Sequence, residues 1–219
     1  MIKSKKQGSM IIISGTTCAG KGTVIKELLK RNKNLKLSIS YTSRDIRPGD
    51  VVGSTYHFVS KEEFESKIAN GDFLEYALVH GNYYGTPKGE IIKMLDEGYD
   101  VILEIDVEGA KKIKKMFPST ILIFIMAPSM EVVKERIKNR NSESTEQILQ
   151  RFKTAYQEIN EVYNYNYVVV NDILEDAVLK VESILISEKC RVDRIEDVYL
   201  NNKEEMIHEL LIDKEFNNE

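Results

Sequence analysis

The sequence predicts an α/β fold in which a mostly parallel sheet is flanked by helices. Five short apolar runs, each suited to a buried strand, alternate with longer stretches whose apolar residues recur at helical spacing. A glycine-rich segment joins the first of these runs to the first helix. Residues 41–84 break the alternation, and we expect them to form a mixed-strand insert.

The individual elements are predicted from apolar patterns and from capping signals. Because strands covered on both faces lack polar alternation, we place strands at 10–14, 37–41, 100–105, 121–126 and 167–170. Helices are expected at 21–31, 61–70, 87–97, 130–140, 146–163 and 174–189. The second helix has the clearest limits, since the capping box Ser60-Lys61-Glu62-Glu63 precedes it and Gly71 follows it. A chain of 219 residues predicts one domain with a lid or small insert.

Composition and charge argue against several classes of protein. No apolar run approaches the length of a membrane span and no signal peptide opens the sequence, so we expect a soluble, cytoplasmic protein. The two cysteines, Cys18 and Cys190, are too few for a disulfide framework and favour a reducing compartment. The net charge of −4 comes largely from acidic residues in 191–219. Without a basic stripe, broad nucleic-acid binding is not expected.

The strongest single motif is a phosphate-binding loop, or P-loop. Gly15-Thr16-Thr17-Cys18-Ala19-Gly20-Lys21-Gly22-Thr23 lies between a predicted strand and a helix and matches G-x-x-x-x-G-K. Backbone N–H groups of such a loop hold a polyphosphate, and Lys21 reaches its β- and γ-phosphates. The alternative, a glycine-rich turn with an exposed lysine, does not explain the strand-loop-helix context. Gly22 replaces the usual Mg²⁺-binding hydroxyl residue, so Thr23 either takes part of that role or only caps the helix.

A pair of arginines in the insert predicts a phosphorylated acceptor. Arg44 and Arg47 follow a predicted strand and are preceded by hydroxyl residues. Two guanidinium groups can each bind a dianionic phosphate through two hydrogen bonds, a geometry that lysines do not offer. The Asn-Lys-x-Asp signature of GTPases is absent from the sequence, so a small kinase is the simpler user of the P-loop.

Five motifs in order give the sequence its resemblance to the guanylate kinase family. After the P-loop come S-x-T-S-R-x-x-R-P-G-D, F-L-E-Y-A, G-N-Y-Y-G-T and L-E-I-D-V-E-G-A, and the resemblance spans about residues 10–189. It implies the P-loop nucleoside monophosphate kinase fold, with a mixed-β GMP-binding insert and a helical lid. It also implies transfer of the γ-phosphoryl group of ATP to GMP, and to dGMP, in purine nucleotide metabolism.

The resemblance implies a GMP site within and beside the insert. Glu75 takes the position of the acid that reads the base: a carboxylate only accepts hydrogen bonds, and guanine offers it two adjacent donors, whereas adenine lacks the N1–H. Two arginines and two tyrosines take the positions that hold the phosphate. The implied GMP-binding residues are Ser40, Arg44, Arg47, Tyr56, Glu75, Tyr84, Thr86 and Glu104.

The resemblance also implies an ATP site, a lid and Mg²⁺ as cofactor. Phosphoryl transfer needs positive charge around the migrating group, which lid arginines supply on closure. Arg140 and Arg151 fit the family positions, and Arg136 is a third arginine of the lid. The implied ATP-binding residues are Gly15, Thr16, Thr17, Cys18, Ala19, Gly20, Lys21, Gly22, Thr23, Arg140 and Asn171, the catalytic residues are Lys21, Arg44, Arg140 and Arg151, and Mg²⁺ is assigned, through water, to Thr23 and Asp106.

One departure from the family and two uses of Asp106 stay open. Thr16-Thr17-Cys18 replaces the usual Pro-Ser-Gly, so Cys18 would cost about 1–3 kcal/mol of strain if its position requires a positive φ. Asp106 and Glu104 could instead be acids at a strand end that cap the next helix.

We expect residues 10–189 to form the guanylate kinase-like domain. Its core comprises 10–36, 87–135 and 165–189, the GMP-binding insert is 37–86, and the lid is 136–164. A basic tail, 1–9, precedes the domain and an acidic extension, 190–219, follows it. Apolar residues at helical spacing in 206–211 would pack on the domain or on a second subunit, which leaves a homodimer open.

Two other functions compete with this one. A related P-loop kinase would use another phosphorylated acceptor, such as a ribose bisphosphate or a different monophosphate. A non-catalytic guanylate kinase-like scaffold would bind peptides and would be expected to lack the P-loop lysine or the lid arginines. Glu75 favours GMP over the first alternative, and Lys21 with Arg140 and Arg151 favours an enzyme over the second.

Overall fold

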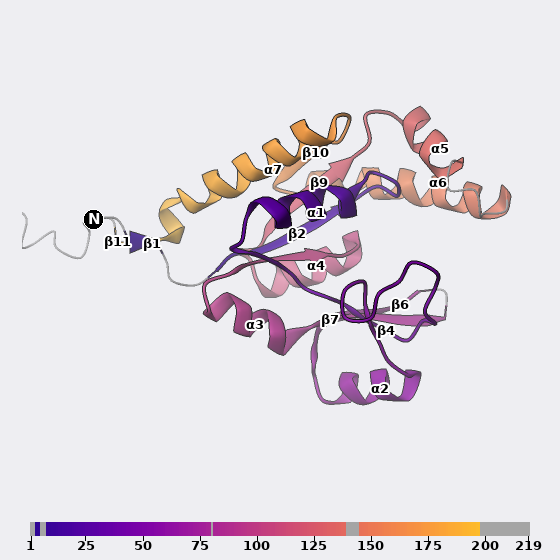
Figure 1. The fold of residues 1–219 in the computed structure, drawn as a ribbon, viewed down its shortest axis with the longest axis horizontal. Helices are drawn as coiled ribbons and strands as arrows, with labels where there is room; N and C mark the ends of the chain where they lie inside the picture. Colours follow the sequence, from indigo (N-terminus) through magenta and orange to yellow (C-terminus); the bar gives the residue numbers. More distant parts are fainter. Residues whose placement is uncertain (1–2, 5–7, 80, 139–144, 198–219) are drawn as a thin grey trace, which may run out of the picture. The chain divides into compact units, whose positions relative to one another are not determined.

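The computed structural model describes residues 3–4, 8–79, 81–138 and 145–197 (Figure 1). The chain divides into two compact units, residues 7–182 and residues 1–6 with 183–219. The larger unit contains all the predicted site residues. Within the described residues, no helix has the length and apolar character needed to cross a membrane.

A five-stranded sheet forms the centre of the larger unit; the sequence predicted a mostly parallel sheet, and all the pairings of this one are parallel. Its strand order is β10–β9–β2–β8–β3. Strands β2, β8 and β9 are rich in Ile, Val and Leu and are buried along nearly their whole length. The strands are β2 (Met10–Gly15), β3 (Leu35–Leu37), β8 (Asp100–Glu104), β9 (Ile121–Met126) and β10 (Tyr167–Val170).

Helices cover both faces of this sheet. Ile12 and Leu103 share one buried cluster with residues of α3 (Lys88–Asp96) and α4 (Val107–Met116). Neighbouring side chains on a strand point to opposite faces, and Figure 1 draws α1 (Lys21–Arg31) and α4 on opposite sides of β2. Helix α7 (Leu174–Lys189) begins after β10. The sequence prediction did not place a helix at α4.

The insert is a four-stranded mixed sheet of order β5–β4–β7–β6, as expected. Its elements are β4 (Tyr41–Thr42), β5 (His57–Phe58), α2 (Lys61–Ala69), β6 (Phe73–Val79) and β7 (Asn82–Pro87). Ser60 caps α2 by accepting a hydrogen bond from the Glu63 N–H, at 3.1 Å. Phe64 of α2 stacks on Phe73 and Tyr83 and so anchors the helix to the sheet.

The single strand predicted at 37–41 is wrong. The chain pairs with β8 as far as Leu37, crosses at residues 38–40, and then pairs with β7 from Tyr41. An apolar run does not reveal a change of partner strand. Residues 38–40 therefore connect the core sheet to the insert.

Two helices follow β9, the first beginning in the predicted core segment 87–135 and the second lying within the predicted lid, 136–164. They are α5 (Met130–Lys138) and α6 (Thr145–Asn160), and a 3-10 turn, η1 (Val162–Asn164), follows them. The helix predicted at 146–163 therefore ends earlier, at Asn160. The predicted end of the helix 130–140, at Arg140, and the predicted capping box at Ser144 lie outside the described residues.

The smaller unit joins parts of both predicted tails. Strand β1 (Lys3–Ser4) pairs antiparallel with β11 (Ile195–Asp197), which follows a 3-10 turn, η2 (Val192–Arg194). The buried Glu188 carboxylate forms ion pairs with Arg191, at 3.6 Å, and Arg194, at 3.2 Å. The apolar residues of 206–211 lie outside the described residues.

Candidate active site

The P-loop lies between β2 and α1, and glycines allow its path. Gly15 has a φ of 153°, and a Cβ atom there would lie 1.8 Å from the Ile125 carbonyl oxygen of β9. Gly20, the N-cap of α1, has a φ of 85°, which suits glycine. The loop therefore passes close over the sheet and delivers its backbone to the start of a helix, where anions bind.

Lys21, the first residue of α1, folds back over its own loop. Its Nζ donates hydrogen bonds to the carbonyl oxygens of Gly15, at 2.8 Å, and Thr16, at 3.2 Å. The ammonium group is thus held beside the loop; within the described residues it forms no ion pair shorter than 4.0 Å, although its charge acts on the nearby carboxylates of Glu104 and Glu158. A phosphate placed against the loop would meet this charge directly.

Cys18 adopts the left-handed conformation that the family's glycine would adopt freely. Its φ is 62°, the single positive value among the described non-glycine residues. Its side chain packs against an apolar cluster that includes Val133 of α5 and Ala155 of α6. Cys18 thus combines backbone strain with apolar packing against the two helices.

This conformation makes Cys18→Gly more stable than Cys18→Ala. Both variants lose the thiol packing, but only alanine retains a Cβ atom at a positive φ, so we expect a difference of about 1 kcal/mol in the free energy of unfolding. Urea unfolding of the two purified variants measures it. Greater stability of the alanine variant would contradict strain at this position.

Three side chains outside the loop, those of Asn171, Arg136 and Glu158, form hydrogen bonds with its backbone. Of these, only Asn171 is among the predicted site residues. The Asn171 amide donates to the Ala19 carbonyl, at 2.7 Å, and Arg136 donates to the Cys18 carbonyl, at 3.3 Å. Glu158 of α6 accepts a hydrogen bond from the Thr17 N–H, at 2.8 Å. Burial raises the pKa of Glu158, although the Thr17 contact opposes this. Nothing in the polar pattern of α6 distinguishes Glu158 from its neighbouring acids.

Two cavities connect the P-loop with the insert. The larger, about 580 Å³, is lined by Gly15, Lys21, Gly22 and Glu158, and the smaller, about 230 Å³, by Glu75 and Tyr84. Both are also lined by Ser40, Tyr56, Glu104, Ile105 and Asp106. Because these residues border both cavities, a phosphate at the P-loop and a ligand at Glu75 would be neighbours.

Aromatic rings and one arginine gather at the insert side of the site. The rings of Tyr56 and Tyr84 have centroids 5.9 Å apart, in an edge-on arrangement. The Arg44 guanidinium lies 5.4 Å from the Tyr56 ring centroid and is paired with Asp50, at 2.8 Å. Neither Arg44 nor Arg47 lines either cavity; Arg44 is buried beside the rings, and Arg47, further along the same loop, is exposed.

Glu75 on β6 is held in place from two sides. Thr86 of β7 donates a hydrogen bond to its Oε1, at 2.6 Å. A Cβ atom at Gly109 of α4 would lie 3.2 Å from its Oε2, so the glycine leaves room for the carboxylate. Burial raises the pKa of Glu75 and outweighs the Thr86 hydrogen bond. Desolvation also raises the pKa of Glu104, and the positive charge of Lys21 opposes part of this shift.

If Glu75 reads guanine, as the sequence resemblance implies, its raised pKa predicts a pH dependence for the use of GMP. As pH falls through this pKa, the carboxylate gains a proton and loses an acceptor, so kcat/KM for GMP is expected to fall at a pH above the ordinary range of glutamic acid. The GMP phosphate also titrates near pH 6. Steady-state rates between pH 5 and 8 for the wild type and Glu75→Gln separate the two. An identical profile in both proteins would contradict this prediction.

Asp106 follows β8 and caps α4. Its Oδ1 accepts a hydrogen bond from the Gly109 N–H, at 2.7 Å, so the helix-capping alternative describes this contact. Its side chain also lines both cavities, and its second carboxylate oxygen is not used in that cap. Thr23 is exposed on the first turn of α1. Mg²⁺ in kinases is held largely by phosphates and water, so a site with only one or two protein oxygen atoms, here from Asp106 and Thr23, fits it.

The lid arginines can be compared only in part. Arg140 lies outside the described residues, and for Arg151 the structure gives the helix but not the side chain. Arg136 contacts the loop after β10 as well as the P-loop, donating to the Asn171 carbonyl at 3.3 Å. It was named as a lid residue but was not assigned to the site.

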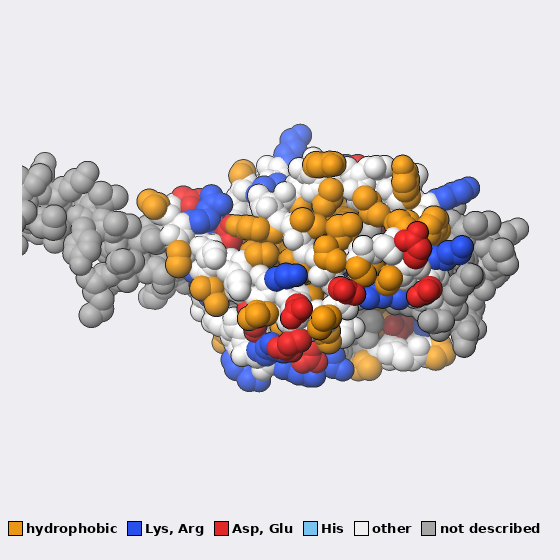
Figure 2. Space-filling model, turned by 90° about the horizontal axis from the view of Figure 1, so that it is seen from above, with side chains coloured by type: hydrophobic (Ala, Val, Ile, Leu, Met, Phe, Trp, Pro, Cys, Tyr) orange, Lys and Arg blue, Asp and Glu red, His pale blue; other side chains and the backbone are white. Residues whose placement is uncertain are grey.

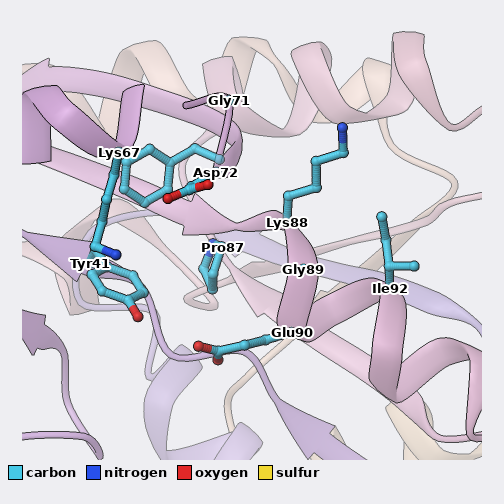
Figure 3. Close-up of a pocket in the computed structure, with 10 residues that line it drawn as sticks. Tyr41, Lys67, Gly71, Asp72, Pro87, Lys88, Gly89, Glu90 and Ile92 are labelled. Atoms are coloured by element: carbon cyan, nitrogen blue, oxygen red, sulfur yellow. The ribbon is translucent and has the colours of Figure 1, made fainter. Parts of the chain in front are cut away.

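A third hollow, of about 410 Å³, lies away from the P-loop (Figure 3). Tyr41, Lys67 and Glu90 surround it, with Lys67 placed 5.1 Å from the Tyr41 ring centroid. Burial and the Glu90 carboxylate raise the pKa of Tyr41. None of the predicted site residues lines this hollow.

The fold and the site together define a class. A P-loop follows the first strand of a parallel sheet, and the cavities beside it extend to an insert that presents a half-buried acid, Glu75, and carries a buried arginine, Arg44. These are the features of a P-loop phosphotransferase that brings a nucleotide and a phosphorylated acceptor together.

Comparisons with known proteins identify the family. The guanylate kinase family model matches residues 7–188. The chain is 57% identical to a guanylate kinase of Clostridium tetani over 95% of this chain and 100% of that protein, and 54% identical to one of Caldanaerobacter subterraneus over 93% and 98%. A crystal structure of guanylate kinase from Anaplasma phagocytophilum matches with a TM-score of 0.75 and 31% identity, covering 93% of this chain and 97% of that one. The chain belongs to the guanylate kinase family.

Proposed function

We propose that this member of the guanylate kinase family binds ATP at its P-loop and GMP at its insert, with the residues assigned below. The chain is an ATP:GMP phosphotransferase: it transfers the γ-phosphoryl group of ATP to GMP and forms ADP and GDP. The observation that supports our assignment is the shared lining of the two cavities, which joins Lys21 to Glu75. The division of roles below follows from that geometry.

The P-loop side binds ATP. Backbone N–H groups of residues 15–23 hold the phosphates, and Lys21 places its charge on the β- and γ-phosphates, where negative charge accumulates during transfer. Asn171 supports the loop through the Ala19 carbonyl, and we assign it to the adenine side of the site. Mg²⁺ bound to ATP would neutralise phosphate charge, with Asp106 and Thr23 holding its water ligands.

The insert side binds GMP. Glu75 accepts hydrogen bonds from the guanine N1–H and amine, while Ser40 or Thr86 donates to O6. Tyr56 and Tyr84 bind the phosphate, together with the two arginines of the insert, Arg44 and Arg47. Glu104, which lines both cavities, borders the acceptor between the two sides. This arrangement orients the GMP phosphate toward the P-loop.

The lid completes the site when ATP and GMP are bound. We assign Arg140 and Arg151 to the migrating phosphoryl group and take 136–164 as the segment that closes, 37–86 as the GMP-binding insert, and 10–36, 87–135 and 165–189 as the core. Closure would also exclude water and so limit hydrolysis of ATP.

The broader setting is proposed on chemical grounds. ATP, GMP and dGMP as substrates fit a role in purine nucleotide metabolism in the cytoplasm, and the two free cysteines suit a reducing compartment. A homodimer is a further proposal; Val168, Ile173 and Leu179 are exposed apolar side chains that could contribute to its interface. Figure 2 shows one face of the molecule, on which many apolar side chains are exposed. Sedimentation velocity measures the mass in solution.

A coupled assay of ADP release tests the function. The protein is mixed with ATP, Mg²⁺ and each of GMP, dGMP, AMP, CMP and UMP, and we expect rapid turnover with the guanine nucleotides alone. Rapid turnover with another acceptor would instead indicate a related kinase. A folded protein that binds GMP without turnover would indicate a scaffold.

A further inference from the structure

The buried ion pair between Arg44 and Asp50 has a geometry that leaves one edge of the arginine open. Both side chains are nearly enclosed, at 9% and 11% exposure. Nη1 of Arg44 donates to Asp50 Oδ2, at 2.8 Å, and Nη2 donates to Asp50 Oδ1, at 3.3 Å. The carboxylate therefore binds the outer edge of the guanidinium through two hydrogen bonds.

The hydrogen-bond donors of Arg44 can be counted individually. A guanidinium has five N–H donors, two on each Nη and one on Nε. Nη1 uses its second hydrogen on the Asp45 carbonyl, at 2.7 Å, so both of its donors are occupied. Within the described part of the chain, no contact is found for Nε or for the second hydrogen of Nη2. These two donors lie on the same edge and form a second fork.

The same carboxylate also sets the loop that carries the second arginine. Asp50 Oδ2 accepts a hydrogen bond from the Arg47 N–H, at 2.7 Å. On the ring side, the Arg44 guanidinium lies 5.4 Å from the centroids of Tyr56 and Phe58, which limits its rotation. These contacts hold the Arg44 guanidinium in one orientation.

We propose that Asp50 is a positioning residue for the acceptor phosphate: it binds one edge of Arg44 and leaves the Nε–Nη2 edge to bind the phosphate of GMP. This inference rests on the proposed function of Arg44. A free arginine side chain would have to be ordered when GMP binds, whereas Arg44 is already ordered. The Arg44 contacts lower the pKa of Asp50, so the carboxylate keeps its charge across the working pH range.

The competing interpretation makes Asp50 an obstacle to GMP. In that case the carboxylate would occupy the guanidinium edge that the phosphate needs, and its removal would tighten GMP binding. The two interpretations therefore predict opposite changes on replacement of Asp50. A purely structural role predicts a third outcome, a general loss of binding.

The test compares Asp50→Asn and Asp50→Glu with the wild type. The amide turns one acceptor into a donor that opposes the Arg44 and Arg47 N–H groups, and we expect KM for GMP to rise by about tenfold or more, while KM for ATP stays within about twofold. Calorimetric titration with GMP and with guanosine, which lacks the phosphate, should show loss of affinity for GMP only. Asp50→Glu keeps the charge and should recover part of the affinity.

Asp45→Asn is the matched control, because it removes one negative charge from the same loop and its side chain is exposed. It should leave both KM values near those of the wild type. Unchanged or tighter GMP binding by Asp50→Asn, or equal loss of guanosine affinity, would overturn the positioning role. If Asp50→Asn does not fold, Asp50→Glu takes its place, and tighter GMP binding or an equal loss of GMP and guanosine affinity in that variant would overturn the positioning role. An inactive wild type would instead overturn the proposed function.

Discussion

Lys21→Met is expected to lower kcat by about 10²-fold to 10³-fold, the loss typical of a removed group that stabilises transition-state charge. In the free protein the ammonium group donates to the carbonyls of Gly15 and Thr16 and therefore stands beside the loop before ATP binds. Methionine preserves the length of the side chain and removes its charge. Steady-state assays with saturating ATP and GMP measure the effect.

Lys33→Met serves as the control for this prediction. Lys33 follows α1, is exposed, and lines neither cavity of the site. Its replacement removes the same charge and should leave kcat within about twofold of the wild type, as surface substitutions generally do. If Lys21→Met retained kcat while the protein remained folded, the assignment of the P-loop lysine would be wrong.

Local patterns predicted the central fold because each strand carries its own signal. Strands β2, β9 and β10 coincide within a residue with the predicted runs, and their continuous apolar character reflects burial in a parallel sheet. The failures occur where structure depends on distant partners. The strand predicted at 37–41 splits because its pairing passes from β8 to β7, and helix α4 was missed although Asp106 provides its cap.

The residues of the site show the same contrast: those in a contiguous motif could be predicted, and those that act through contacts in the folded chain could not. The P-loop is a contiguous motif, so its residues could be predicted together. Asp50 and Glu158 could not be assigned, since the first acts through the side chain of Arg44 and the second reaches Thr17 from a helix 141 positions further along the chain. Acidic residues are common on exposed surfaces, and only the three-dimensional contact distinguishes these two.

Glu75→Gln is expected to lower kcat/KM for GMP by about 10²-fold to 10⁴-fold. The glutamine amide would present a donor where guanine also presents donors, and sites built on buried hydrogen bonds discriminate strongly against such mismatches. Thr86 can still donate to the remaining oxygen, so the side chain keeps its support. Rates with GMP and AMP should show a smaller preference for GMP than in the wild type.

The same variant, Glu75→Gln, should keep or gain stability while it loses activity. Burial raises the folded-state pKa of Glu75, so its contribution to stability is fully present below the unfolded-state pKa and is lost as pH rises through the folded-state value. At pH 7 the ionised carboxylate is therefore a net cost that glutamine removes, and we expect the Tm of Glu75→Gln to equal or exceed that of the wild type.

A control in the same insert separates the two effects. Glu65→Gln removes a negative charge at an exposed position that accepts a hydrogen bond from Tyr83, and it should change neither GMP use nor Tm appreciably. If the Tm of Glu75→Gln were clearly lowered, its loss of activity would be explained by misfolding and not by loss of guanine recognition. Retained activity and preference for GMP would remove Glu75 from the base-reading role. Lost activity at equal or higher stability would mean that the insert maintains a buried charge for recognition at the expense of folding.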